Sequence, residues 1–169
     1  MRSIASVLAL FLFFALGACS RLSAPLELKK DALFGELKGI ARNHQTWKPL
    51  DFEGSTLAFE NEPQGALALV LVTPVKGSAN VWGMARHLPV RFEHYRVLRI
   101  VPKKILGTET LVGTFEVSEE GMTSFVRSVT WKKGSVLYDT LLITPKKNPQ
   151  ESLDFFKDLT LRVLRVSLH

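Results

Sequence analysis

Residues 129–159 read VTWKKGSVLYDTLLITPKKNPQESLDFFKDL, and this stretch decides the fold. Its first part has strand-like apolar patterning, which a Lys-Lys-Gly-Ser cluster interrupts before a second apolar run at 136–144. Asn148 can cap a helix in which Pro149 takes the first position and Glu151 lies three residues after the cap. The stretch therefore predicts two antiparallel strands joined by a short turn and followed by an amphipathic helix.

The same strand-and-turn pattern extends upstream, because short apolar segments alternate there with Gly-containing turns. The pattern predicts an α+β domain with an antiparallel sheet of about five to six strands flanked by helices. No repeat or second-domain linker is present, so we expect one globular domain over residues 26–169. Further strands are predicted at 55–60, 66–75, 95–106, 109–118 and 122–131, and further helices at 26–42 and 79–88.

This order of elements, with its meander and final amphipathic helix, resembles the PsbP and DcrB-like α/β/α sandwich over about residues 50–166. The resemblance implies an antiparallel sheet covered by helices. Because the family includes lipoproteins and is not typically catalytic, it also implies a binding or assembly role. One departure is the strand-Pro-Gly-Trp segment that such domains often carry near their start, to which Trp47-Lys48-Pro49 is only loosely similar.

Residues 1–18 have the pattern of an export signal. Arg2 provides a positive start, residues 7–16 form the apolar run VLALFLFFAL, and small residues follow. The rival interpretation is a membrane anchor, although the run has about half of the ~20 apolar residues that a membrane span needs. The amino terminus therefore predicts an exported protein.

The tetrad Leu16-Gly17-Ala18-Cys19 resembles the lipobox of bacterial lipoproteins. The resemblance implies cleavage before Cys19 and attachment of diacylglycerol to its thiol, and more than one acyl chain holds a protein stably on a membrane. Ser20, where Asp would favour the inner membrane, implies an outer-membrane protein that faces the periplasm. Residues 19–25 would then be the lipidated Cys and a short tether. The alternative is a plain secretory signal or uncleaved anchor in which Cys19 has no role.

Basic residues are concentrated in the segment from Arg86 to Lys104. The whole chain has 22 Lys and Arg, 16 Asp and Glu and a formal charge of +6. Regular strand alternation would point Arg96 and Lys104 to one face and Arg99 and Lys103 to the other. We expect the segment to bind an anionic surface rather than nucleic acid, and a simple solvated face is the alternative. Its six basic residues are Arg86, Arg91, Arg96, Arg99, Lys103 and Lys104.

No catalytic motif is present, and a single Cys excludes a multi-thiolate metal site. His87 and His94 are seven residues apart, too far on a helix to share a metal. We therefore expect no enzyme activity, cofactor or metal. Asp139 is expected to face solvent or to pair with Arg127 across a hairpin. Aromatic residues including Trp47, Trp82 and Trp131 are expected in the core, with a ligand cleft as the alternative.

These features together predict a membrane-anchored lipoprotein. Its partners would be the membrane, through the lipid anchor, and an envelope protein or anionic lipid. The alternative is a carrier or chaperone that holds an apolar or lipid ligand between sheet and helix.

Overall fold

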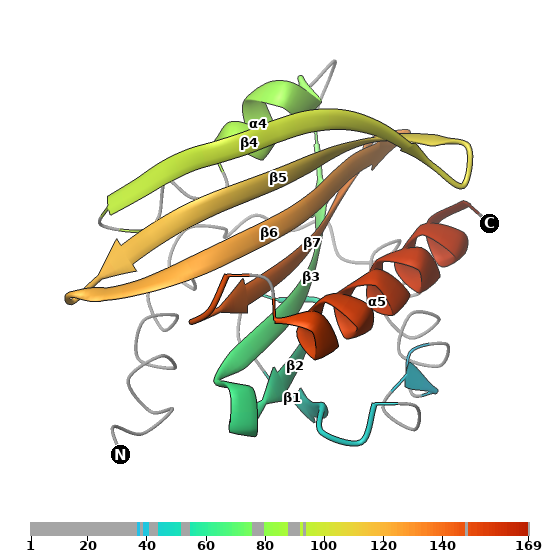
Figure 1. The fold of residues 1–169 in the computed structure, drawn as a ribbon. Helices are drawn as coiled ribbons and strands as arrows, with labels where there is room; N and C mark the ends of the chain where they lie inside the picture. Colours follow the sequence, from blue (N-terminus) through green and yellow to red (C-terminus); the bar gives the residue numbers. More distant parts are fainter. Residues whose placement is uncertain are drawn as a thin grey trace.

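The computed structural model describes residues 37, 39–40, 44–51, 55–75, 80–87, 92, 94–147 and 149–168. These residues form a seven-stranded antiparallel sheet with helices packed on it, which confirms the expected α+β class (Figure 1). The elements in chain order are β1 (Lys48–Leu50), β2 (Leu57–Asn61), η2 (Glu62–Gln64), β3 (Ala66–Pro74), α4 (Val81–His87), β4 (His94–Ile105), β5 (Thr108–Glu119), β6 (Met122–Lys133), β7 (Val136–Thr144) and α5 (Gln150–Leu168).

The strand order is β1-β2-β3-β7-β6-β5-β4, so the chain crosses the sheet once. After β3 it passes through α4 to the opposite edge, where β4 begins a four-stranded meander. The meander returns strand by strand until β7 pairs with β3, for example at Val70 and Thr140. The two halves of the sheet are thus joined by a pairing between distant parts of the sequence.

Most of the sequence predictions match the observed elements to within about two residues. One strand was not expected, because β1 has only three residues and contains Pro49. The expected helix at 26–42 lies mostly outside the described residues, as do the signal segment and the tether. Within it, Leu37 and Ile40 are buried in the core.

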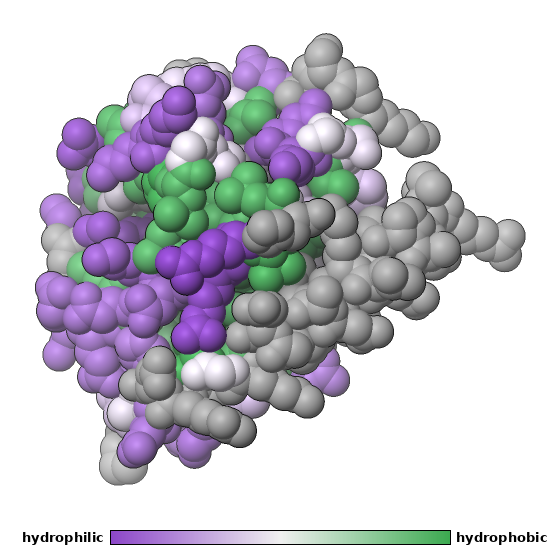
Figure 2. Space-filling model, turned by 90° about the vertical axis from the view of Figure 1, so that its right-hand side faces the viewer, coloured by the Kyte–Doolittle hydropathy of each residue, from purple (hydrophilic) through white to green (hydrophobic). Residues whose placement is uncertain are grey.

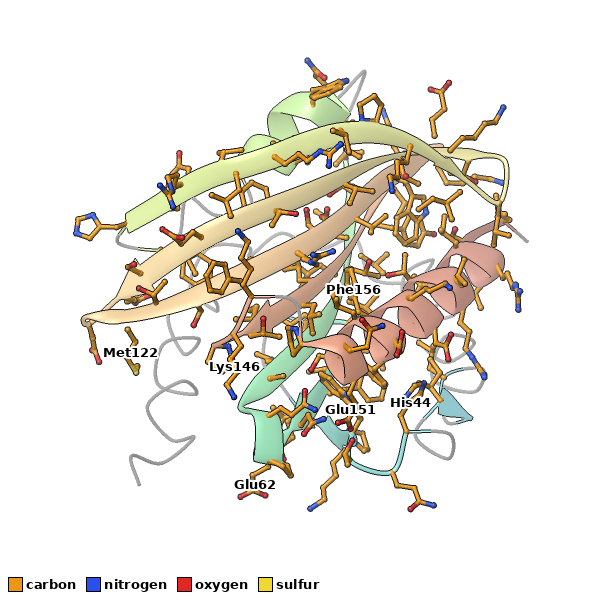
Figure 3. All side chains as sticks on the ribbon, viewed as in Figure 1. His44, Glu62, Met122, Lys146, Glu151 and Phe156 are labelled. Atoms are coloured by element: carbon orange, nitrogen blue, oxygen red, sulfur yellow. The ribbon has the colours of Figure 1, made fainter. Side chains whose placement is uncertain are left out.

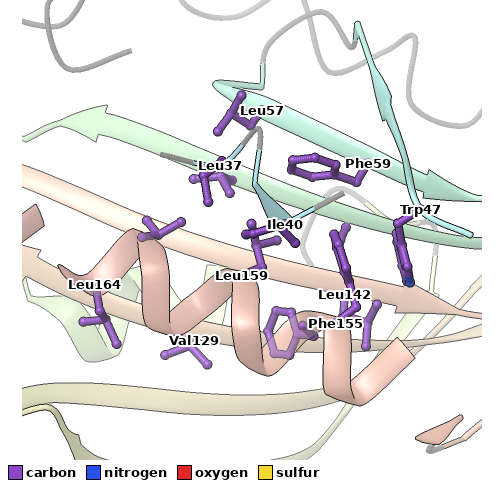
Figure 4. Packing of buried hydrophobic residues seen from close by; sticks show 14 of the residues in the cluster. Leu37, Ile40, Trp47, Leu57, Phe59, Val129, Leu142, Phe155, Leu159 and Leu164 are labelled. Carbon is purple, nitrogen blue, oxygen red and sulfur yellow. The ribbon is translucent and has the colours of Figure 1, made fainter. Parts of the chain in front are cut away.

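The face of the sheet that α5 covers carries the larger core (Figure 4). Trp47 stacks on Phe155 of α5, with ring centroids 4.0 Å apart and planes 4° from parallel. Phe59 of β2 meets the same ring edge-on at 5.4 Å. These side chains and Leu159 are almost completely buried, so packed rings fill the space between sheet and helix.

Two buried hydrogen bonds fix α5 on the sheet. The Trp131 indole Nε1–H donates to Ser167 Oγ at 3.1 Å, and the hydroxyls of Thr140 and Thr160 lie 2.9 Å apart. In both pairs the polar groups are buried but hydrogen-bonded to each other. These bonds determine the rotation of the helix as well as its position.

The opposite face has a smaller apolar cluster, and its described buried polar side chains are Ser128, Thr130 and Asp139. Phe115, Val126 and Leu141 lie in this cluster, and Phe92 packs against it. Figure 1 shows α4 on this side of the sheet, behind β4 and β5, where its Ala85 is fully buried.

Candidate binding surface

A bulge in β4 determines where the basic residues point. The register with β5 slips between Val97 and Arg99, which leaves Leu98 without a partner. Paired residues of an antiparallel sheet share a face, and Arg96 pairs with Glu116 while Arg99 pairs with Thr114. Arg96 and Arg99 therefore lie on one face, and the expectation from regular alternation was wrong.

The six basic residues expected to bind an anionic surface do not form one patch in the described structure. Arg96, Arg99 and Lys103 lie on the face that α5 covers in part, whereas Lys104 pairs with Glu109 on the opposite face. Arg96 also contacts Glu116, with Nη2 and Oε2 3.0 Å apart. Arg91 and the side chain of Arg86 lie outside the described part of the chain, as does Cys19.

The β4–β5 hairpin and the start of α4 enclose a pocket of about 670 Å³. Pro102 and Leu111 pair with each other on the face that carries α4, and Lys132 of β6 lies farther along that face. Thr110 Oγ1 donates to the Lys103 carbonyl oxygen at 2.9 Å, a further contact between β4 and β5. The lining residues are Asn80, Val81, Trp82, Pro102, Lys103, Lys104, Glu109, Thr110, Leu111 and Lys132.

The first residues of α4 fix one wall of this pocket. Asn80 Oδ1 accepts a hydrogen bond from the Trp82 backbone N–H at 3.0 Å, as an N-cap side chain does. Trp82 is 41% exposed, whereas Trp47 and Trp131 are almost fully buried. The expectation that the tryptophans are core residues was therefore wrong for Trp82, because it lies at the pocket and not between sheet and helix.

Asp139 is the most perturbed acid of the described chain. It is buried on the face that carries α4, where its Oδ1 accepts a hydrogen bond from Thr130 Oγ1 at 2.6 Å. Burial raises the pKa of Asp139 from 3.8 to about 6, although the hydrogen bond from Thr130 acts in the opposite direction. Arg127 pairs with Leu142 and so lies on the other face. Both expectations for Asp139, a solvent-facing side chain or a pair with Arg127, were therefore wrong.

A polar cluster joins the amino-terminal part of the described chain to α5 (Figure 3). His44 Nε2 lies 3.0 Å from Asp158 Oδ2, and Thr46 Oγ1 donates to Glu151 Oε1 at 2.6 Å. Gln64 of η2 also donates to Glu151. Since each of these groups bonds another part of the fold, the cluster holds α5 in place. No group of three or more metal-ligating side chains gathers among the described residues.

Sequence reasoning did not single out Leu106 and Lys132, and it named Trp82 as a pocket residue only in the alternative of a ligand cleft. Leu106 offered the clearest signal, because a Leu-Gly pair stands where a tight hairpin turn ordinarily has Asn-Gly. The other two come near the hairpin only through α4 and the β5–β6 pairing. No local pattern in the sequence carries that information.

Two solved structures share this fold at low sequence identity. The solution structure of the cyanobacterial PsbP protein CyanoP from Synechocystis matches 68% of this chain and 79% of its own, with a TM-score of 0.50 and 10% identity. PA94 from Pseudomonas aeruginosa, a protein of unknown function, matches 57% of this chain and 69% of its own, with a TM-score of 0.49 and 14% identity. The CyanoP match shows the PsbP-like fold alone.

Comparison with models of protein families gives no match, and neither does comparison with curated protein sequences. Among the helices of the described residues, none has the length and apolar character required to span a membrane.

Proposed function

We propose that this chain is a bacterial lipoprotein, anchored through Cys19, whose folded domain binds an envelope component without catalysing a reaction. One observation carries the proposal: the single Cys of the chain directly follows the apolar run and the small residues of the signal segment. Ser20 supports an outer-membrane location with the domain in the periplasm. The PsbP-like fold is compatible with binding and does not by itself identify a partner.

The packing of the domain favours binding at its surface over carriage of an apolar ligand inside it. A carrier would need room between sheet and α5, but Trp47 and Phe155 are in stacking contact there. Leu159, Val163 and Leu164 of α5 are also buried in that interface. The described pocket instead lies on the other face, where lysines and Trp82 line it. Surface binding therefore uses groups that the fold leaves accessible.

Lipid attachment tests the anchor. The full chain, expressed in a bacterium with two membranes and labelled with radioactive palmitate, should carry label and fractionate with the outer membrane. Cys19→Ser should lose both the label and the membrane fraction, whereas Ser20→Ala should keep them. Ser20→Asp should keep the label but move to the inner membrane. An unlabelled wild-type chain, or Cys19→Ser that fractionates like the wild type, would contradict the proposal.

A further inference from the structure

The turn between β4 and β5 contains an apolar residue in an unfavourable backbone conformation. Leu106 has φ of 49° and Gly107 has φ of 80°, as in the two-residue hairpin turns that prefer Asn-Gly. A Leu in the left-handed region is uncommon and strained. Its side chain is also 47% exposed, so burial does not compensate for the strain. Glu120 has the same conformation in the β5–β6 turn, with φ of 48°, so Leu106 differs from it by being an apolar side chain at an exposed tip.

Trp82 supplies a second exposed apolar group close to this hairpin. It lines the same pocket as Lys103 and Lys104, which lie three and two residues before the turn residue Leu106. At about 3.4 Å per residue, the hairpin tip is then on the order of 10 Å from the pocket. Trp82 and the two lysines that lead into the Leu106 turn therefore line one pocket.

Cations surround these two apolar groups. Lys103, Lys104 and Lys132 line the pocket, and Glu109 is the one acidic residue among the lining residues. Lys103 and Lys104 belong to opposite faces of β4, so positive charge flanks the hairpin on both sides. Figure 2 faces the end of the molecule that carries the hairpin, and there green apolar surface lies directly among purple hydrophilic side chains. We name the set of Trp82, Lys103, Lys104, Leu106 and Lys132 the hairpin surface.

We infer that the hairpin surface docks on an anionic lipid bilayer, with Leu106 and Trp82 in the interfacial layer and the lysines against lipid phosphates. The occupant follows from the chemistry: a dissolved anion would satisfy the lysines but leave both apolar groups in water. A bilayer interface takes Trp and Leu at headgroup level and attracts lysines to its negative surface. Long lysine side chains can reach the phosphates while their stems contact apolar groups. This inference deepens the proposed function and rests on it for the anchor that keeps the domain near a membrane.

The emission of Trp82 provides a direct test, since the other two tryptophans are buried. The full chain is reconstituted into vesicles that contain a brominated phospholipid quencher, with either phosphatidylglycerol or only phosphatidylcholine as the remaining lipid. The difference in emission between the wild type and Trp82→Phe isolates Trp82. We expect quenching of Trp82 in anionic vesicles, little quenching in neutral ones, and a decrease as salt screens the lysines.

Variants separate the apolar and the charged contributions. Leu106→Asn relieves the strained turn yet should lower the quenching of Trp82. Lys103→Glu with Lys104→Glu should weaken docking by about tenfold or more. The matched control is Met122→Asn, because Met122 is also exposed but lies at the opposite end of the sheet (Figure 3), and it should leave quenching unchanged. Circular dichroism verifies that each variant folds.

The possible failures are distinguishable. A chain that floats with the vesicles while Trp82 stays unquenched in anionic lipid overturns the docking inference and leaves the anchor standing. Quenching that is equal for the wild type and both hairpin variants overturns it too. If the chain carries no lipid, the proposed function fails, and the same vesicles added to the chain in solution still decide whether Trp82 enters them.

Discussion

Asp139 places an ionisable group where water does not reach. Leu71 of β3 and Thr130 of β6 pair with it across the sheet, and the described structure gives it one hydrogen bond, from Thr130. The charged form of a carboxyl group is disfavoured in such surroundings, which is why burial raises the pKa of Asp139 to about 6. The folded protein therefore binds a proton more tightly at this site than the unfolded chain does.

This difference predicts a loss of stability as pH rises. Below pH 3.8, the pKa of this carboxyl in the unfolded chain, the group is protonated in both the folded and the unfolded state. The stability that depends on protonation of Asp139 is then fully present. As pH rises through about 6, the pKa of the folded state, the free energy of unfolding falls by about 3 kcal/mol in total. Asp139→Asn should remove this part of the pH dependence. Urea unfolding between about pH 4 and pH 8 measures it, and equal pH dependence in the wild type and the variant would contradict the argument.

Gly113 illustrates a constraint of a different kind, since it is required by space and not by backbone conformation. A Cβ at this position would lie 2.5 Å from Ser128 Oγ and 2.6 Å from Phe115 Cε2, and both neighbours are fully buried. Gly113→Ala should therefore lower the free energy of unfolding by about 1–3 kcal/mol.

Gly83 in α4 is the matched control, because nothing lies within 4 Å of a Cβ added there. Gly83→Ala should raise stability by about 0.5–1 kcal/mol through the better helix propensity of Ala. Denaturant unfolding of both variants provides the comparison. A Gly113→Ala variant as stable as the wild type would show that Phe115 and Ser128 can move apart.

At the scale of the element, the sequence pattern was sufficient for strands with one apolar face. β5, β6 and β7 were predicted to within two residues at each end because apolar alternation and Gly-containing turns are local signals. β1 was missed because three residues that include Pro49 carry too little pattern. The position of the bulge in β4, between Val97 and Arg99, was not predicted, since no residue type marks it, and the faces assigned to Arg96 and Arg99 were wrong as a result.

The same bulge has a second consequence, because β4 is an edge strand of twelve residues. Long regular edges invite pairing with another chain, and bulges, prolines and lysines prevent it. Deletion of Leu98, the residue without a partner, should give a continuous register with β5 and a straighter edge. We expect the deletion variant to fold and to self-associate with increasing concentration in sedimentation velocity experiments. Leu98→Ala keeps the bulge and should remain like the wild type, and a deletion variant that sediments like Leu98→Ala would refute the role of the bulge.

At the scale of the whole molecule, the strand order could not be predicted from local sequence patterns. The pairing of β3 with β7 joins segments about seventy residues apart, and only packing over both faces selects it. The pocket has the same origin, because α4 reaches β5 and β6 through the crossover that follows β3. The sequence indicated basic residues along β4 but not the tryptophan, the leucine or the third lysine that the fold adds to them.

The distribution of burial predicts which parts of the molecule open first. Every residue of β7 except Val136 is buried, whereas no residue of β4 is. Amides of β7 should therefore exchange hydrogen only through global unfolding, and those of β4 through local opening at lower free energy.

Phe155→Ala tests whether the core under α5 is part of the global unit. Loss of the ring that contacts Trp47 and Phe59 should cost about 3–5 kcal/mol and lower protection in β3, β6 and β7 together. β4 should change little, because its amides already exchange through local opening. Asp154→Ala, an exposed neighbour in the same helix, should leave the pattern close to that of the wild type. Hydrogen exchange read by mass spectrometry on peptides from each strand decides the outcome. If β4 were as protected as β7, or if Phe155→Ala affected α5 alone, the sheet and its helix would not unfold as one cooperative body.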